Sequence, residues 1–240
     1  MSVTTTPPSR PDPDSIPSRI GAVAGAAPGA LLGAVFGAAA LVRRTKPLHP
    51  VGHVGDGALR ITAPQGELGV PLLAAEASHR CTVRWSRAMG LPSPAPDFEG
   101  LAIRLHDPTA DLLFASTGTG ALTRFLLVPR PAGTHGPQTT LLPVATAAGS
   151  LMFRVTPAEG AFGDGATTAE EPPTRFDLAV AHSGSGWTTV GVLEVTWGPD
   201  EPMRFDPVEN LLPGTEQYPV VRALREPAYF MARRGAAART

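Results

Sequence analysis

The chain has 240 residues, enough to bury one large core or two small ones, and its many short alternating segments favour one domain. A formal charge of -1 excludes nucleic-acid binding that depends on a basic surface. The single cysteine, Cys81, cannot form an internal disulfide and is predicted to be a small buried residue. The 27 prolines and 26 glycines predict many turns.

The first 44 residues divide into a polar tail and an apolar stretch. Residues 1–18 are rich in Pro, Ser, Thr and Asp, which predicts a disordered tail because little apolar area can be buried. Residues 19–44 are predicted to form a Gly- and Ala-rich helix, and residues 20–42 carry no charge. This stretch is long enough to cross a bilayer but only weakly apolar, so it is either a helix packed on the domain or a membrane anchor or export segment. The expected localisation is cytoplasmic or membrane-associated accordingly.

Residues 45–240 are predicted to form one domain of short strands joined by turns. Alternating apolar positions predict strands over residues 58–62, 81–86, 101–106, 112–115, 151–156, 176–181 and 188–197. Such a series favours a closed antiparallel β-barrel of about seven or eight strands. Helices are expected over residues 121–128 and from residue 219 onward, so the predicted class is α+β, with helices flanking the barrel.

Two turn-rich segments carry residue types that also occur in active sites. The run from His182 to Gly186 joins two predicted strands, so its serines are predicted to shape a hairpin. Between His49 and His53 lie Pro50 and Gly52, which disfavour the helical spacing that suits a metal-binding pair. This histidine segment is predicted to be a loop that enters the first strand.

Arg225 lies four residues before Tyr229 near the C-terminus. On a helix this spacing places a guanidinium and a phenol on one face, where the positive charge favours the phenolate. A phenolate is a ligand of haem iron, and a histidine commonly stands on the opposite face of the porphyrin. The alternative is a core tyrosine with a satisfied hydroxyl. The pair suggests a haem site in which Tyr229 binds the metal and Arg225 supports the cofactor.

Several further segments, in the same order along the chain, resemble those of one enzyme family. They are His49-Pro-Val-Gly52, Val83-Arg84-Trp85-Ser86, Asp97-Phe-Glu-Gly100, Asp111-Leu-Leu, Val190-Gly191-Val-Leu, Leu212-Pro-Gly214-Thr-Glu216 and the pair Arg225 and Tyr229. The family is the haem-dependent catalase-like superfamily, and its short catalase-related peroxidase branch is the most similar part. The resemblance covers about residues 45–235.

The resemblance implies a haem b cofactor and peroxide as a substrate, with a small organic molecule or a second peroxide as reductant. It implies that His49 is the distal acid–base residue and that Ser86 orients it. Lys46 and Arg84 would contact the haem propionates, and Tyr229 would be the proximal iron ligand. If haem is bound, the implied enzyme is an oxidoreductase of the peroxidase or catalase type.

Three positions depart from the pattern of the family. Where the family has a distal Asn, this chain has Phe114-Ala115-Ser116-Thr117. Ser116 or Thr117 could offer a weaker hydroxyl donor in its place, with Ser116 as the candidate catalytic residue. Lys46 replaces an Arg and loses the planar fork that suits a carboxylate. Pro227 would kink a helix that runs into Tyr229. The missing Asn favours peroxidase-like or monooxygenase-like chemistry over rapid catalase turnover.

Two haem-free functions are alternatives. The run Ser116-Thr-Gly118-Thr-Gly120 follows a predicted strand, and its amides could cradle a phosphoester, although the Gly-Lys-Ser/Thr ending of a P-loop is missing. The barrel could instead hold an apolar ligand such as a lipid, with residues 20–42 as the anchor. The sequence leaves the oligomeric state open, and an oligomer is compatible with it.

Overall fold

The structure is a computed structural model that describes residues 51–91, 94–159, 171–201, 203–219 and 221–222. The predicted tail and N-terminal helix lie outside these residues, as do Lys46, His49, Arg225 and Tyr229. The chain divides into a unit of residues 1–46 and a unit of residues 47–240, and every described residue belongs to the second unit. In this described part, no helix is long and apolar enough to cross a membrane.

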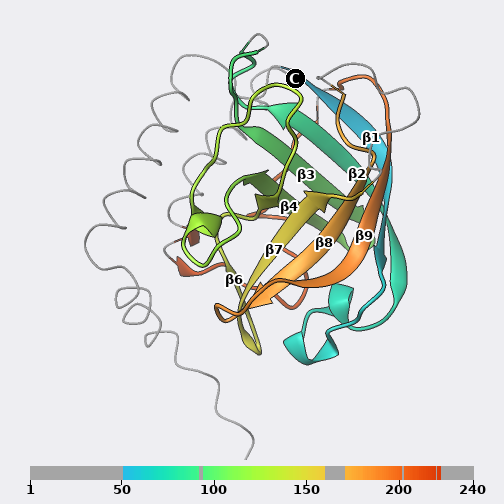
Figure 1. The fold of residues 1–240 in the computed structure, drawn as a ribbon. Helices are drawn as coiled ribbons and strands as arrows, with labels where there is room; N and C mark the ends of the chain where they lie inside the picture. The colour runs from blue at the N-terminus through green and yellow to red at the C-terminus, as the bar shows by residue number, and fades with distance from the viewer. Residues whose placement is uncertain (1–50, 92–93, 160–170, 202, 220, 223–240) are drawn as a thin grey trace, which may run out of the picture. The chain divides into compact units, whose positions relative to one another are not determined.

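The described residues form nine strands and three short 3-10 helices (Figure 1). The strands are β1 (Val51–Ile61), β2 (Ala77–Arg87), β3 (Glu99–His106), β4 (Thr109–Ser116), β5 (Gln138–Thr139), β6 (Val144–Thr146), β7 (Gly149–Pro157), β8 (Arg175–His182) and β9 (Thr188–Trp197). The 3-10 helices are η2 (Gly66–Leu68), η3 (Pro71–Leu73) and η4 (Thr123–Phe125).

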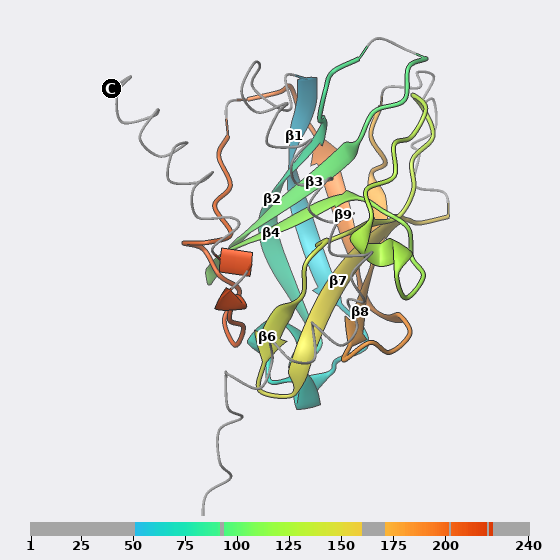
Figure 2. The ribbon, with the colours of Figure 1, turned by 90° about the vertical axis from the view of Figure 1, so that its left-hand side faces the viewer.

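Eight of the strands close into an antiparallel β-barrel. The order across the sheet is β5-β4-β3-β2-β1-β9-β8-β7-β6, and an additional pairing of β5 with β7 joins the two ends. β6 pairs only with β7 in the register given, so it stands beside the ring and is not part of it. The turned view in Figure 2 shows β1 to β4 and β7 to β9 as two walls around the same interior.

The core lies inside this barrel because alternate residues of each strand point inward. Residues with no more than 1% exposure come from many strands around the ring, namely Leu59, Val83, Ile103, Phe153, Phe176, Leu178 and Leu193. Burial of one such side chain contributes about 1.5–3 kcal/mol. The barrel is therefore a filled core and not a pore.

The ring is completed by only two residues of β5. Ser116 of β4 is paired with Gln138, and Gln138 is paired with Val155 of β7. Near β5, the segment 207–217 lies against the outside of β4 and β7, and a pocket lies between them. The pocket is lined by residues of β4, of β7 and of this segment, among them Leu112, Phe153 and Leu212.

All seven predicted strands are present, and most are longer than predicted. The prediction that residues 49–55 form a loop was wrong for the described residues, because β1 already begins at Val51. Glycine usually weakens a strand, but here it allows close contact between backbones. A Cβ atom on Gly55 would lie 2.5 Å from the carbonyl oxygen of Thr196 in β9. The sequence also did not predict β5 and β6, which have two and three residues.

The prediction of flanking helices is not met in the described part of the chain, where only 3-10 helices occur between residues 51 and 201. The helix expected over residues 121–128 is reduced to η4 because the chain after it returns to β4. Val128 N donates to Ser116 O at 2.9 Å, and Leu127 forms a bridge with Thr117. The helix expected from residue 219 lies largely outside the described residues. The predicted hairpin from His182 to Gly186 is confirmed as the turn between β8 and β9.

Cys81 is buried in β2, as predicted, and its burial raises the pKa of the thiol to about 12. Because the thiolate is the reactive form, we expect Cys81 in the folded protein to react with a thiol reagent at less than about one hundredth of the rate in guanidinium chloride. The release of chromophore from Ellman's reagent at about pH 8 measures both rates. Free cysteine in the same two buffers is the control, and equal rates in folded and unfolded protein would contradict the buried position.

Candidate functional site

Two of the residues implied by the family resemblance, Arg84 and Ser86, lie on the outer face of β1 to β4. Gly52, Ser86, Gly100 and Ala115 are in register across the four strands and form one row of this face. Since alternate residues point to opposite sides, this row faces away from the core residues of the same strands. The structure therefore brings one predicted catalytic residue, Ser86, into a row of small residues.

A second row lies directly beside the first. It contains Val54, Arg84, Ala102 and Leu113, again in register. Arg84 and Ser86 are two residues apart on β2 and therefore share the outer face. The two rows define what we call the outer face: Gly52, Val54, Arg84, Ser86, Gly100, Ala102, Leu113 and Ala115.

Five of the eight residues of the outer face are glycine, alanine or serine. Gly52, Gly100 and Ser86 are buried, and Ala102 and Ala115 are half-buried. A Cβ atom on Gly52 would lie 2.5 Å from Trp85 O and 3.0 Å from the Nη2 atom of Arg84. Glycine is thus required where the guanidinium of Arg84 crosses β1.

Arg84 makes a two-pronged contact with a carboxylate of its own chain. Its Nε atom donates to Asp200 Oδ1 at 3.2 Å and its Nη2 atom to Asp200 Oδ2 at 3.2 Å. Asp200 follows β9, and its side chain is 32% exposed. The carboxylate of Asp200 uses the same fork geometry that would bind the carboxylate of another molecule.

Ser116 lies on the opposite face of β4 and does not join Arg84 and Ser86. It is paired with Gln138, and its position in the alternation is that of the core residues Leu112 and Phe114. The Ser116 hydroxyl accepts a hydrogen bond from Glu99 N at 3.2 Å and donates to Val128 O at 2.8 Å. The residue of this segment that reaches the outer face is Ala115, which has no polar group.

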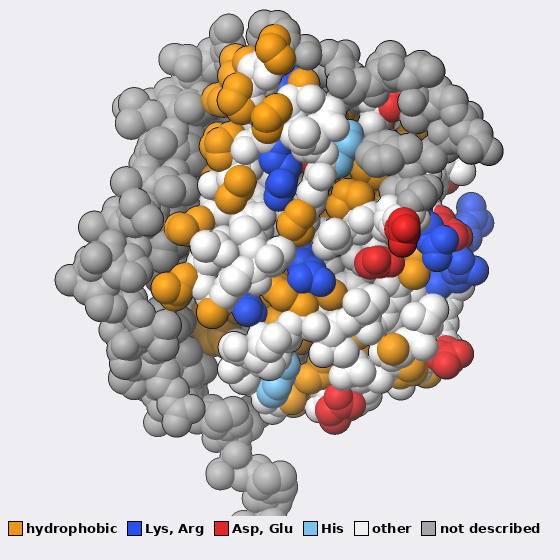
Figure 3. All heavy atoms as spheres, in the orientation of Figure 1, with side chains coloured by type: hydrophobic (Ala, Val, Ile, Leu, Met, Phe, Trp, Pro, Cys, Tyr) orange, Lys and Arg blue, Asp and Glu red, His pale blue; other side chains and the backbone are white. Residues whose placement is uncertain are grey.

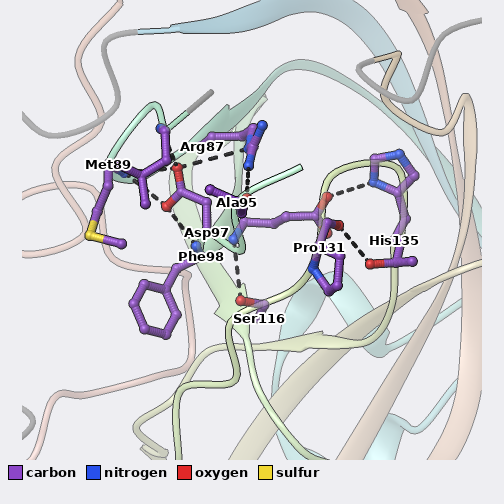
Figure 4. Close-up of polar contacts among 11 residues, drawn as sticks. Arg87, Met89, Ala95, Asp97, Phe98, Ser116, Pro131 and His135 are labelled. Atoms are coloured by element: carbon purple, nitrogen blue, oxygen red, sulfur yellow. Dashed lines mark hydrogen bonds and ion pairs between the residues drawn. The ribbon is translucent and has the colours of Figure 1, made fainter. Parts of the chain in front are cut away.

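A polar cluster that the sequence did not predict lies at the inner side of β2 and β3 (Figure 4). His135 Nδ1 and Glu99 Oε1 are 2.6 Å apart, and both side chains are at most 6% exposed. The ring of Trp85 meets the ring of His135 edge-on, with the two ring centroids 5.9 Å apart, and its centroid lies 6.1 Å from that of the His53 ring. The sequence could have indicated Glu99, because the alternation of apolar residues in β3 places this charged residue at an inward position. The contact with His135 spans 36 residues and has no local signal.

The loop proposed as a phosphate cradle uses its amides within the chain. Gly118 N donates to Thr123 O at 3.1 Å, and Gly120 N donates to Thr123 Oγ1 at 3.0 Å. Thr117 also turns inward, with its hydroxyl donating to Thr139 Oγ1 at 3.1 Å. These groups are satisfied without a ligand.

The fold of the domain is similar to the folds in two solved structures. No protein-family model and no curated protein sequence matches the chain. A bacterial catalase structure matches with a TM-score of 0.53 over 80% of this chain at 15% identity, and a fungal catalase matches with a TM-score of 0.53 over 78% at 13% identity. The fold is catalase-like. The catalase-like barrel predicted from the sequence is confirmed, whereas the short peroxidase branch stays a prediction.

The catalase-like chain spans 58% of the bacterial catalase and 59% of the fungal one. At these identities the likeness concerns the fold alone, and the chemistry must be argued from the residues. Among the described residues there is no group of three or more His, Cys, Asp or Glu side chains that could hold a metal ion. Tyr229, which the sequence resemblance implies as the ligand of a haem iron, lies outside the described residues.

Proposed function

We propose that this catalase-like chain is a haem-binding, peroxide-dependent oxidoreductase that holds the porphyrin against the outer face of β1 to β4. The observation that carries the proposal is the position of Arg84 beside Ser86 on the outer face of a catalase-like barrel. Peroxide and a small organic reductant are the proposed substrates.

Two properties of the outer face support the proposal, namely small side chains and a positive charge. A porphyrin is flat and largely apolar, and Gly100, Ala102 and Ala115 give neighbouring positions of β3 and β4 small side chains against which it could lie. Haem also carries carboxylates at one edge, and the guanidinium of Arg84 already binds a carboxylate through two nitrogens. Arg84 is thus the described residue that would hold a propionate, together with Lys46.

The remaining roles follow from the sequence resemblance. The haem would supply the redox chemistry of its iron, with Tyr229 as ligand and Arg225 favouring the phenolate. His49 would take a proton from peroxide and return it to the departing oxygen. Ser86 would hold the imidazole in orientation. Ala115 offers no amide donor, which favours peroxidase-like or monooxygenase-like turnover over rapid catalase turnover.

A haem titration of the full-length protein tests the proposal. We expect a Soret band that saturates at one haem per chain and is lost in Tyr229→Phe. In Arg84→Ala, affinity should fall about ten-fold, which corresponds to about 1.4 kcal/mol. In Asp200→Ala, affinity should rise, because haem no longer competes with this carboxylate for Arg84. In His49→Ala the Soret band should persist while peroxide-dependent oxidation of a phenolic dye is lost.

Arg80→Ala is the matched control, since Arg80 is an exposed residue of the same strand and should leave the titration unchanged. If neither the wild type nor Asp200→Ala changes the spectrum of added haem, the haem proposal is wrong. If Tyr229→Phe keeps an unaltered Soret band, the proposed ligand is wrong.

A second function is favoured by the contact between Arg84 and Asp200. Since the chain itself already supplies a carboxylate to Arg84, a haem-free barrel that binds an apolar or phosphoester ligand is the alternative. Residues 20–42 would then serve as a membrane anchor. Absence of haem binding in the titration, together with binding of a lipid or a phosphoester, would favour this alternative.

A further inference from the structure

Two arginines flank one tryptophan on a side of the barrel that the proposed haem site does not use. Arg124 belongs to η4, Arg154 belongs to β7, and Trp187 lies in the turn between β8 and β9. The guanidinium carbons of Arg124 and Arg154 lie 4.8 Å and 4.9 Å from the centroid of the Trp187 ring. The two positive charges are therefore neighbours, since each lies against the same ring.

Arg124 is fixed by neutral groups. It is 5% exposed, its Nε atom donates to Gly120 O at 3.2 Å, and its Nη1 and Nη2 atoms donate to Ser185 O at 3.3 Å. Carbonyl oxygens satisfy these donors but carry no full negative charge. Trp187 is fixed as well, because its Nε1 atom donates to Thr119 O at 2.8 Å.

Arg154 lacks even such partners. Its Nε atom is buried and forms no hydrogen bond. In the described part of the chain, no group accepts a hydrogen bond from its terminal nitrogens, and the residue as a whole is half-buried. In the described part of the chain, neither Arg154 nor Arg124 forms an ion pair with a carboxylate.

The charge of this pair is poorly compensated. Burial lowers the pKa of Arg124, and burial followed by the charge of Arg124 lowers the pKa of Arg154, with Asp177 acting in the opposite direction. Arginine nevertheless stays charged in proteins. Figure 3 shows basic side chains over the middle of one face of the molecule, and both acidic and basic side chains on the β9 side of that face. Two partly buried positive charges without a paired carboxylate favour the binding of an anion.

We propose that Arg124 and Arg154 bind a phosphate group, either as inorganic phosphate or as part of a phosphate monoester. A guanidinium presents donors in a planar fork that matches two phosphate oxygens, and the terminal nitrogens of the half-buried Arg154 are not occupied by an acceptor among the described residues. Arg124 supplies the second charge from a fixed position. The binding groups are the two cations and not the amides of the neighbouring loop, which Thr123 already satisfies. The site is independent of haem.

Calorimetric titration of the full-length protein with inorganic phosphate, at constant ionic strength set with chloride, tests this proposal. We expect saturable binding of one phosphate per chain. Arg154→Gln should weaken the binding at least about ten-fold, because one of two charge-assisted contacts is lost. Arg80→Gln removes an exposed arginine from β2 and should leave the affinity unchanged. Arg154→Lys, which keeps the charge without the fork, should fall between the wild type and Arg154→Gln.

A parallel titration with phenyl phosphate separates the two sources of the ligand. Tighter binding of the monoester indicates an organic phosphate, and equal or weaker binding indicates the free anion. The proposal is overturned if phosphate heat is no larger than that of sodium chloride at the same ionic strength, or if Arg80→Gln weakens binding as much as Arg154→Gln. The wild-type titration decides the matter even if the Arg154 variants do not fold.

Discussion

Replacement of Asp111 by alanine is expected to lower the free energy of unfolding by about 3–5 kcal/mol. Asp111 is 4% exposed and lies on β4, where it accepts hydrogen bonds from Arg104 Nε at 2.7 Å and Arg104 Nη2 at 2.6 Å. It also accepts from Asp206 N at 2.6 Å and Asn210 Nδ2 at 2.9 Å. The side chain thus joins β3, β4 and the segment that follows β9.

The effect is large because alanine leaves several donors without an acceptor in a buried position. Arg104 would lose its ion pair with Asp111 and would keep its hydrogen bond to Arg204 O and its contact with the ring of Phe205. Chemical denaturation followed by tryptophan fluorescence measures the change. Asp56→Ala is the control, since Asp56 is exposed on β1, and it should change stability by less than about 0.5 kcal/mol. Equal losses in the two variants would refute the role of Asp111.

Replacement of Asp97 by alanine is expected to cost about 3 kcal/mol, from the loss of several buried hydrogen bonds. Asp97 has 0% exposure and accepts from Met89 N at 2.9 Å, Phe98 N at 2.7 Å and Leu91 N at 3.2 Å (Figure 4). Arg87 lies 3.8 Å from the same carboxylate. Asp97 therefore organises the connection between β2 and β3 through backbone amides.

The matched variant is Asp97→Asn, which keeps one acceptor oxygen in place of two. It should lose about half as much stability as Asp97→Ala, because Met89 N and Phe98 N can still be satisfied by one oxygen. Urea unfolding of both variants provides the comparison. An alanine variant as stable as the wild type would show that water replaces the carboxylate.

The barrel could be predicted because its strands follow the alternation of buried and exposed residues. Leu101, Ile103 and Leu105 are buried at every second position of β3, as the sequence pattern indicates. The prediction failed where this pattern is absent. Prolines and glycines around His49 favoured a loop and hid the start of β1 at Val51, and β5, with two residues, is too short to show an alternation. The mutual pairing of β5 and β7 also depends on contacts between distant segments, which no local pattern encodes.

In the candidate site, too, local alternation could be read from the sequence, whereas contacts between distant segments could not. Arg84 and Ser86 share one face, because residues two apart in a strand point to the same side, whereas their proposed roles at a haem stay predictions. The same rule, applied to Leu112 and Phe114, places Ser116 with the core, and that consequence of the alternation was overlooked. Asp200 and His135 could not be found from sequence, because they contact Arg84 and Glu99 across 116 and 36 residues.

The two-residue span of β5 gives the barrel an unequal wall. Along most of its circumference, neighbouring strands hold each other through long ladders, but next to β5 the interior is shielded by the stretch around Leu212. That stretch is anchored to the wall through Asp206, Asn210 and Asp111. On this side, access of water to the barrel interior thus depends on the few hydrogen bonds that Asp111 accepts from Asp206 and Asn210, and not on backbone hydrogen bonds between two long strands. A mutation that loosens them would admit water to Phe153 before any strand pair separates.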